Sequence, residues 1–111
     1  MRSRRVPERG EIVWLQFNPR GHEQSGRRPA FVISPGAYNR RVGLALFCPI
    51  TSQVKGYPFE VALPAEIGIA GVVLSDHVKS LDWRAHGAKR IAKAPQLVID
   101  EVLGKLSTLV S

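Results

Sequence analysis

The sequence has 111 residues, sixteen Lys and Arg against nine Asp and Glu, a net charge of +7 and an isoelectric point near 10.3. This length fits one domain, because two halves would each have too little core, so we expect residues 1–111 to fold together. No apolar run approaches the ~20 residues of a membrane-spanning helix, and we expect no signal peptide at the basic start. The positive charge favours a polyanionic partner, nucleic acid first and an acidic protein second, over a merely soluble basic surface.

Short strands separated by turn residues are predicted up to about residue 83. The stretch 58–63 shows the pattern clearly, since Phe59, Val61 and Leu63 share one side and Glu60 faces the other. A turn rich in Asn, Arg and Gly precedes the third strand. The predicted strands cover residues 11–17, 29–34, 43–51 and 58–63, and residues 71–83 could hold two more.

The final segment, residues 94–110, changes to a helical period. Pro95 stands where a first-turn proline belongs, and Asp100 and Glu101 lie toward the positive end of the helix. Apolar residues recur at helical spacing, at Ile99, Val102, Leu103, Leu106, Leu109 and Val110. We therefore predict a mainly β fold with a C-terminal helix, and the short strands favour a small closed or half-closed barrel. The helix either covers an open end of the barrel or forms part of a subunit contact.

Nothing in the sequence suggests a metal or a cofactor. The three histidines are far apart, no Cys or carboxylate cluster has ligand spacing, and no glycine-rich phosphate loop or Gly-x-Ser-x-Gly motif is present. The only cysteine, Cys48, lies inside the apolar run 44–50, which predicts a buried, inert thiol. A single cysteine cannot form an internal disulfide, so the composition fits a reducing cytoplasm.

Polar residues stand at the ends of several predicted strands. Arg28 is followed at once by a proline and an apolar strand, so its guanidinium leaves a rigid base. Thr51 and Ser52 end one apolar run, and Asp76 and His77 end another. Since the strand ends of a barrel gather at one rim, these groups could converge.

Such a set of residues suits the cleavage of RNA without a metal. In that reaction the substrate's own 2′-OH attacks phosphorus, which leaves a 2′,3′-cyclic phosphate and a free 5′-OH. Arg28 supplies a planar, permanent charge for the phosphorane, and Thr51 and Ser52 can donate hydrogen bonds to non-bridging oxygens. Candidate proton acceptors are Glu23, His22 and His77. The residues alone leave a solvated arginine, a turn hydroxyl and a surface ion pair open as alternatives.

Four segments carry a wider pattern. In chain order they are VPERGEIVWLQFNP, GHEQSGRRPA followed by an apolar strand, PITSQVKGYPFEV and LSDHVKSLDWRAHGAK. Together they resemble the MazF/PemK family of toxin endoribonucleases from bacterial toxin–antitoxin pairs. The predicted C-terminal helix falls where that family has one, so the resemblance covers the whole chain.

The resemblance implies an SH3-like antiparallel barrel of the MazF/CcdB type and a homodimer. It also implies metal-independent cleavage of single-stranded RNA at a short preferred sequence, which suits unpaired bases with exposed edges. An acidic, MazE-like antitoxin would bind across the dimer and block the RNA groove, which fits the charge of +7.

Site residues follow from the matching positions. Arg28 and Thr51 match the family's catalytic arginine and threonine, and Glu23 with Gln24 matches an acidic–amide pair in the loop. We expect Glu23 to be the leading proton acceptor. His22 and His77 depart from the family's pattern and are expected to contact RNA. The remaining residues on segments that line the family's RNA groove are Ser52, Lys55, Asp76, Lys79 and Ser80.

The sequence leaves two rival functions open. A CcdB-like toxin that poisons topoisomerase would not need Arg28 and Thr51 together, and a non-catalytic relative would bind nucleic acid without cutting it.

Three aromatic residues are candidates for the core or for base stacking. Trp14, in mid-strand, is expected in the core. Trp83 is the more plausible exposed ring, for base stacking or a dimer contact, and Phe59 is a second stacking candidate.

Overall fold

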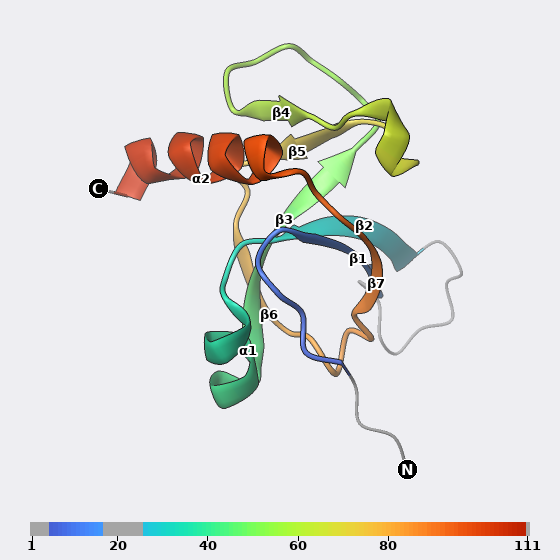
Figure 1. The fold of residues 1–111 in the computed structure, drawn as a ribbon, viewed down its shortest axis with the longest axis vertical. Helices are drawn as coiled ribbons and strands as arrows, with labels where there is room; N and C mark the ends of the chain where they lie inside the picture. Colours follow the sequence, from blue (N-terminus) through green and yellow to red (C-terminus); the bar gives the residue numbers. More distant parts are fainter. Residues whose placement is uncertain (1–4, 17–25, 111) are drawn as a thin grey trace.

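Seven antiparallel strands form one bent sheet in the computed structural model, which describes residues 5–16 and 26–110 (Figure 1). Their order across the sheet is β4-β5-β3-β2-β1-β7, and β6 pairs with β3 beside this path. The strands are β1 (Glu11–Gln16), β2 (Arg27–Val32), β3 (Leu44–Thr51), β4 (Glu60–Ala62), β5 (Val72–Leu74), β6 (Lys79–Asp82) and β7 (Lys89–Lys93). The helical elements are α1 (Gly36–Val42), a single 3₁₀ turn η2 (Ala65–Ile67) and the C-terminal α2 (Gln96–Val110).

β3 is the strand that gives the sheet its shape. One edge of β3 pairs with β2, while its other edge pairs first with β6, from Leu44 to Phe47, and then with β5, at Ile50 and Thr51. Because β3 changes partners midway, the sheet bends there and encloses a core on each side of the central strands. β4 and β7 end the described sheet without pairing to each other, so it is half closed. The expected antiparallel β fold with a C-terminal helix is confirmed.

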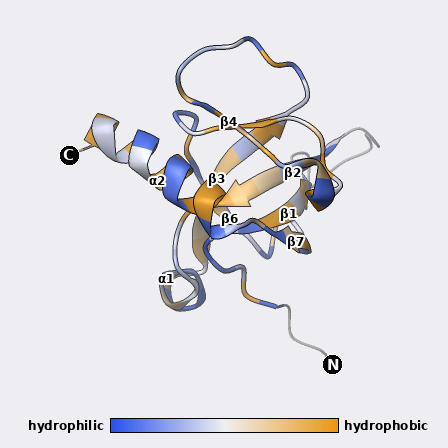
Figure 2. Ribbon diagram, turned by 45° about the horizontal axis from the view of Figure 1, so that its top comes forward, coloured by the Kyte–Doolittle hydropathy of each residue, from blue (hydrophilic) through white to orange (hydrophobic). Residues whose placement is uncertain are grey.

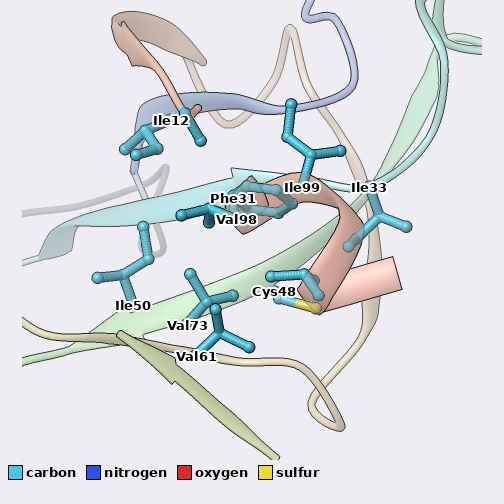
Figure 3. Packing of buried hydrophobic residues seen from close by; sticks show 11 residues of the cluster. Ile12, Phe31, Ile33, Cys48, Ile50, Val61, Val73, Val98 and Ile99 are labelled. Atoms are coloured by element: carbon cyan, nitrogen blue, oxygen red, sulfur yellow. The ribbon is translucent and has the colours of Figure 1, made fainter. Parts of the chain in front are cut away.

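Two hydrophobic clusters follow from the alternation of side chains along the strands. Ile12 and Phe31 belong to the cluster that α2 covers with Val98, Ile99 and Val102 (Figure 3). The second cluster, on the other side, contains Val13, Leu15, Ala30, Val32, Ala45, Phe47, Trp83 and Ala88. Figure 2 shows the hydrophobic residues gathered on the central strands. No helix among the described residues is both long and apolar enough to cross a membrane.

Three elements were not predicted from the sequence, the short turn η2 and two longer ones. The segment read as a turn before the third strand contains α1, and the basic stretch Lys89–Lys93 forms β7 at one edge of the sheet. Only Ile91 and Ala92 are apolar in β7, so the stretch lacks the alternation that identifies a strand. It forms because β1 offers a free edge, to which β7 pairs between Glu11 and Trp14.

A buried polar network fixes α1 against the rest of the molecule. The side chain of Asn39 is fully buried, and its Nδ2 donates hydrogen bonds to the carbonyl oxygens of Pro7 (2.8 Å) and Ser34 (3.1 Å). Ser34 Oγ donates to Asn39 Oδ1 and accepts from the backbone N–H of Leu46. The indole Nε1 of Trp83 donates to the carbonyl oxygen of Asn39 at 2.9 Å. Asn39 therefore joins the N-terminal segment and α1 through its side chain, and the turn after β6 through its backbone carbonyl.

The expected roles of the two tryptophans are reversed. Trp83, predicted as the exposed ring, has 1% of its surface exposed, because its Nε1 finds a buried acceptor and its ring joins the second cluster. Trp14, predicted in the core, is only half-buried, and the guanidinium of Arg27 lies 4.9 Å from its ring centroid. Phe59 is also half-buried.

This reversal can be tested with the matched variants Trp14→Phe and Trp83→Phe, each of which leaves one tryptophan. Fluorescence from Trp83 alone should resist acrylamide quenching, whereas Trp14 alone should be quenched several-fold more strongly. Trp83→Phe should also lower the free energy of unfolding by about 1–3 kcal/mol, because the buried carbonyl of Asn39 keeps only the backbone N–H of Gly43 as a donor and the smaller ring fills the core less well. Equal quenching of the two variants would contradict the assignment.

Cys48 is fully buried, as predicted, in the cluster that α2 covers (Figure 3). Burial raises the pKa of its thiol to about 12, and the negative charge of Asp76 adds to the effect. At pH 8 about one thiol in ten thousand is then the reactive thiolate. The native protein should react with Ellman's reagent only as fast as it unfolds, while the same protein in guanidinium reacts within seconds. Rapid labelling of folded protein would contradict this prediction.

Candidate functional site

The pairing of β2 with β3 brings Arg28 beside Thr51. The register pairs Ala30 with Pro49, and continuing it by two residues sets Arg28 opposite Thr51. Both residues line one hollow of about 410 Å³. The other residues around this first hollow are Arg27, Pro29, Ile50, Ser52, Gln53 and Ala70. The two residues that the sequence singled out therefore meet on one surface.

Thr51 is held at the end of β3 by its backbone. Its Oγ1 accepts a hydrogen bond from the backbone N–H of Gln53 at 3.1 Å, which leaves the hydroxyl proton to be donated elsewhere. Gly71 packs directly on the Thr51 carbonyl with φ of +125°, and a Cβ at position 71 would overlap that oxygen. The glycine is thus required both for its backbone conformation and for the close approach.

Among the residues that the structure describes, Arg28 presents a guanidinium without a partner. Its side chain is exposed, and it makes no hydrogen bond or ion pair with any residue that the structure describes. Its neighbour Arg27 differs, since that guanidinium lies over the ring of Trp14. A cation with unfilled donors, fixed on a paired strand, is suited to binding an anion.

A second hollow, of about 340 Å³, adjoins the first and shares Thr51 and Gln53 with it. It is also lined by Lys55, Tyr57, Glu60, Leu74, Asp76 and His77. The Glu60 carboxylate accepts hydrogen bonds from the backbone N–H groups of Lys55 (2.8 Å) and Gly56 (2.9 Å). Both of its oxygens therefore shape the loop between β3 and β4, which forms one wall of the hollow.

Tyr57 and Asp76 form the polar centre of the second hollow. The Tyr57 hydroxyl donates to Asp76 Oδ1 at 2.7 Å and lies 3.5 Å from His77 Nε2. The hydrogen bond to the Asp76 carboxylate is the main cause that raises the pKa of Tyr57 to about 12. The tyrosine therefore stays protonated near neutral pH, and the carboxylate keeps lone pairs for a further donor.

A third hollow, of about 240 Å³, joins the first at Arg28 and the second at His77. Lys79 adds a positive charge there, and apolar residues, including Phe47 and Leu81, form the rest of its wall. The three hollows together make a continuous surface that we call the active face. It combines two arginines, two lysines, two carboxylates and several hydroxyl groups with apolar walls, a mixture that can contact both phosphates and bases.

The predicted site residues fall into three groups. Arg28, Thr51, Ser52, Lys55, Asp76, His77 and Lys79 line the active face. Ser80 is exposed on β6 but lines none of the three hollows, because successive residues of a strand point to opposite sides. His22, Glu23 and Gln24 lie outside the described residues.

Sequence reasoning missed Tyr57, Gln53 and Glu60. Their roles depend on how the loop after Thr51 folds back, which no periodic pattern reveals. A usable signal was the tyrosine in an otherwise polar loop directly before a strand. Within residues 5–16 and 26–110, no three His, Cys, Asp or Glu side chains gather as a metal site.

Fold and site together define a class, namely a small, basic, half-closed antiparallel β protein in which an arginine and a threonine line one hollow. The sequence profile described as PemK-like, MazF-like toxin of type II toxin–antitoxin systems matches residues 8–110. The chain belongs to this family, so the resemblance inferred from its motifs is confirmed.

The similarity to individual relatives extends over nearly the full length. The chain is 43% identical over 111 residues to the endoribonuclease toxin MazF of Escherichia coli K12, covering 99% of both chains. It is 39% identical to Escherichia coli endoribonuclease PemK, covering 94% of this chain and 82% of that protein. A crystal structure of MazF from Deinococcus radiodurans matches with 57% identity and a TM-score of 0.86, covering 96% of this chain and 98% of the other.

The contact between Gly71 and Thr51 can be tested with the matched variants Gly71→Ala and Gly68→Ala. Both glycines have positive φ, but a Cβ at Gly68 would meet nothing. Each variant should lose about 1–3 kcal/mol of stability to backbone strain, and Gly71→Ala should lose more. Only Gly71→Ala should move the amide resonances of Thr51 and Ser52. If both variants lose the same stability and the amide resonances of Thr51 and Ser52 do not move, the contact between Gly71 and Thr51 is contradicted.

Proposed function

We propose that this protein is the toxin component of a type II toxin–antitoxin module and a metal-independent endoribonuclease. Its substrate is single-stranded RNA, principally mRNA in the cytoplasm, which it cuts at a short preferred sequence, so that translation and growth stop. The observation that carries the proposal is that Arg28 and Thr51 line the same hollow. Relatives named endoribonucleases, at 39–43% identity, support it.

The proposed reaction uses the 2′-OH of the RNA as the nucleophile. Its oxygen attacks the adjacent phosphorus, the bond from phosphorus to the 5′ oxygen breaks, and the products carry a 2′,3′-cyclic phosphate and a 5′-OH. Arg28 stabilises the charge on the phosphorane, and Thr51 donates its free hydroxyl proton to a non-bridging oxygen. Glu23 accepts the 2′ proton, and the leaving 5′ oxygen takes up a proton from solvent to become the 5′-OH.

Recognition of the RNA falls to the residues around this pair. Lys55 and Lys79 attract phosphates on either side of the scissile bond. Asp76 accepts a hydrogen bond from a donor on a base edge, since Tyr57 occupies only part of its accepting capacity. The other proposed RNA contacts are His22, Gln24, Ser52, His77 and Ser80.

The proposed partners are an acidic MazE-like antitoxin and a second copy of the chain. Structures of MazE–MazF complexes from Deinococcus radiodurans, one with 53% identity and a TM-score of 0.88, support the first. Apolar side chains exposed on α2 support the second, since Leu97 is 83% exposed and Val110 74% exposed.

The proposal is tested by incubating the protein with a mixed RNA pool in excess chelator. Fragments should have 5′-OH ends that polynucleotide kinase labels without prior phosphatase treatment. Arg28→Ala should lower the cleavage rate by at least about 10²-fold, because the developing charge loses its main donor. Arg28→Lys keeps the positive charge but not the planar guanidinium, so its cleavage rate should lie between those of the wild type and Arg28→Ala.

Lys93→Ala on β7 removes one positive charge away from the active face and serves as the control. Wild-type cleavage rates in folded Arg28→Ala protein would overturn the proposal. Retention on RNA without new 5′-OH ends would indicate a non-catalytic binding protein. Absence of both binding and cleavage would favour a CcdB-like poison of topoisomerase.

A further inference from the structure

A second group of positive charges lies away from the active face. It consists of four exposed arginines, which we call the arginine platform: Arg9, Arg40, Arg41 and Arg84. They come from the N-terminal segment, α1 and the turn after β6, which lie together in Figure 1. None of the four lines any of the three hollows.

The acidic groups described in the same three segments form no ion pair with the arginine platform, and the charges of Glu8 and Asp82 offset only part of its four positive charges. Glu8 accepts a hydrogen bond from the backbone N–H of Gly36, and Asp82 accepts from the backbone N–H groups of Arg84 and Ala85. Glu11 is buried and pairs instead with Arg5 and Arg90. Among the described residues, none of the four platform arginines forms an ion pair.

The arginine platform stands on a rigid base. The network around Asn39 joins its three segments through buried hydrogen bonds. Arg9 Nε donates to the carbonyl oxygen of Ile33 at 2.7 Å, and the Arg84 guanidinium lies 4.8 Å from the ring centroid of Trp83. Two of the guanidiniums are therefore held in place before any ligand arrives, which reduces the entropy that binding costs.

An aromatic ring accompanies these charges. Tyr38, three residues before Arg41 on α1, is 39% exposed, and residues three apart lie on one helix face. A guanidinium for a phosphate next to a ring for stacking, as Arg41 and Tyr38 provide, is a combination that binds single-stranded nucleic acid. An acidic peptide would use the charges but has no bases to stack on the ring. The ring is the feature that favours RNA over a protein.

We infer that the arginine platform and Tyr38 form a second RNA-binding surface, which holds the strand that flanks the cleavage site. The inference goes beyond the proposed function, which needs only the active face, and it rests on RNA being the substrate. The surface raises affinity for long RNA without regard to sequence, because its contacts are to phosphates and to a stacking face. A strand that touches both surfaces must extend beyond the active face, so a longer RNA gains more from the arginine platform than a short one.

The test compares Arg40→Gln/Arg41→Gln with the wild-type chain for binding to oligouridylates of six and thirty nucleotides. Fluorescence anisotropy is recorded from 50 to 300 mM salt. The thirty-mer should bind the variant several-fold more weakly at 50 mM salt, and the slope of log affinity against log salt should fall by about 1.4, or 0.7 per lost phosphate contact. Affinity for the six-mer should change less than twofold.

Three further variants sharpen the result. Lys89→Gln/Lys93→Gln removes the same charge from β7 and should leave the slope unchanged. Arg40→Lys/Arg41→Lys should restore most of the slope, since the charge returns. Tyr38→Ala should weaken binding of the thirty-mer and leave the slope as it is, because stacking releases no counterions. Thermal unfolding confirms that each variant is folded.

Equal losses in the α1 and β7 double variants would overturn the inference in favour of a general charge effect. An unchanged affinity for the thirty-mer, with weaker binding of poly-glutamate to the α1 variant, would assign the surface to an acidic protein instead. Binding to oligouridylate requires no cutting, so the two proposals can fail separately. If the wild-type chain cuts no RNA but the α1 double variant shows the predicted fall in slope, the proposed function is refuted and the arginine platform is still an RNA-binding surface.

Discussion

The shared use of β3 by two half-sheets is the constraint on which the site depends. β2 runs antiparallel to β3, and the register that seats Phe31 and Val32 in opposite clusters also brings Arg28 level with Thr51. A slip of one residue would send each side chain to the other face and separate the pair. The packing of two cores therefore fixes the distance between a cation and a hydroxyl, and the site needs no separate device to hold them together.

The residues proposed for cleavage and those proposed for substrate contact lie on different parts of the fold. The permanent charge of Arg28 stands on a paired strand, and Thr51 is fixed at a strand end by Gln53 and Gly71. Of the residues proposed to contact the substrate, Ser52 and Lys55 lie on the loop that Glu60 ties down, whereas Asp76 and His77 lie between β5 and β6. Such a loop can change in sequence without disturbing either core, as long as the carboxylate that shapes it remains.

Sequence reasoning was most successful where a periodic pattern or a chemical motif marked the residue. The helical spacing after Pro95 predicted α2, and the position of Arg28 between charged residues and an apolar strand marked it as a site candidate. It failed where the deciding partner is distant: α1 depends on Asn39 bonds to Pro7 and Trp83, which are 32 and 44 residues away. β7 likewise depends on the free edge of β1. The position of Tyr57 depends on its hydrogen bond to the carboxylate of Asp76, 19 residues later.

The basic edge strand β7 has a consequence for the state of the protein at high concentration. An unpaired strand edge invites another copy to add on through its backbone, and a half-closed sheet cannot remove that risk by closure. Lys89, Arg90 and Lys93 line this edge with exposed charge, so a second β7 would approach against repulsion. These three residues interrupt the apolar alternation by which a strand is recognised in a sequence. Their charges also oppose amyloid-like stacking of one chain on another.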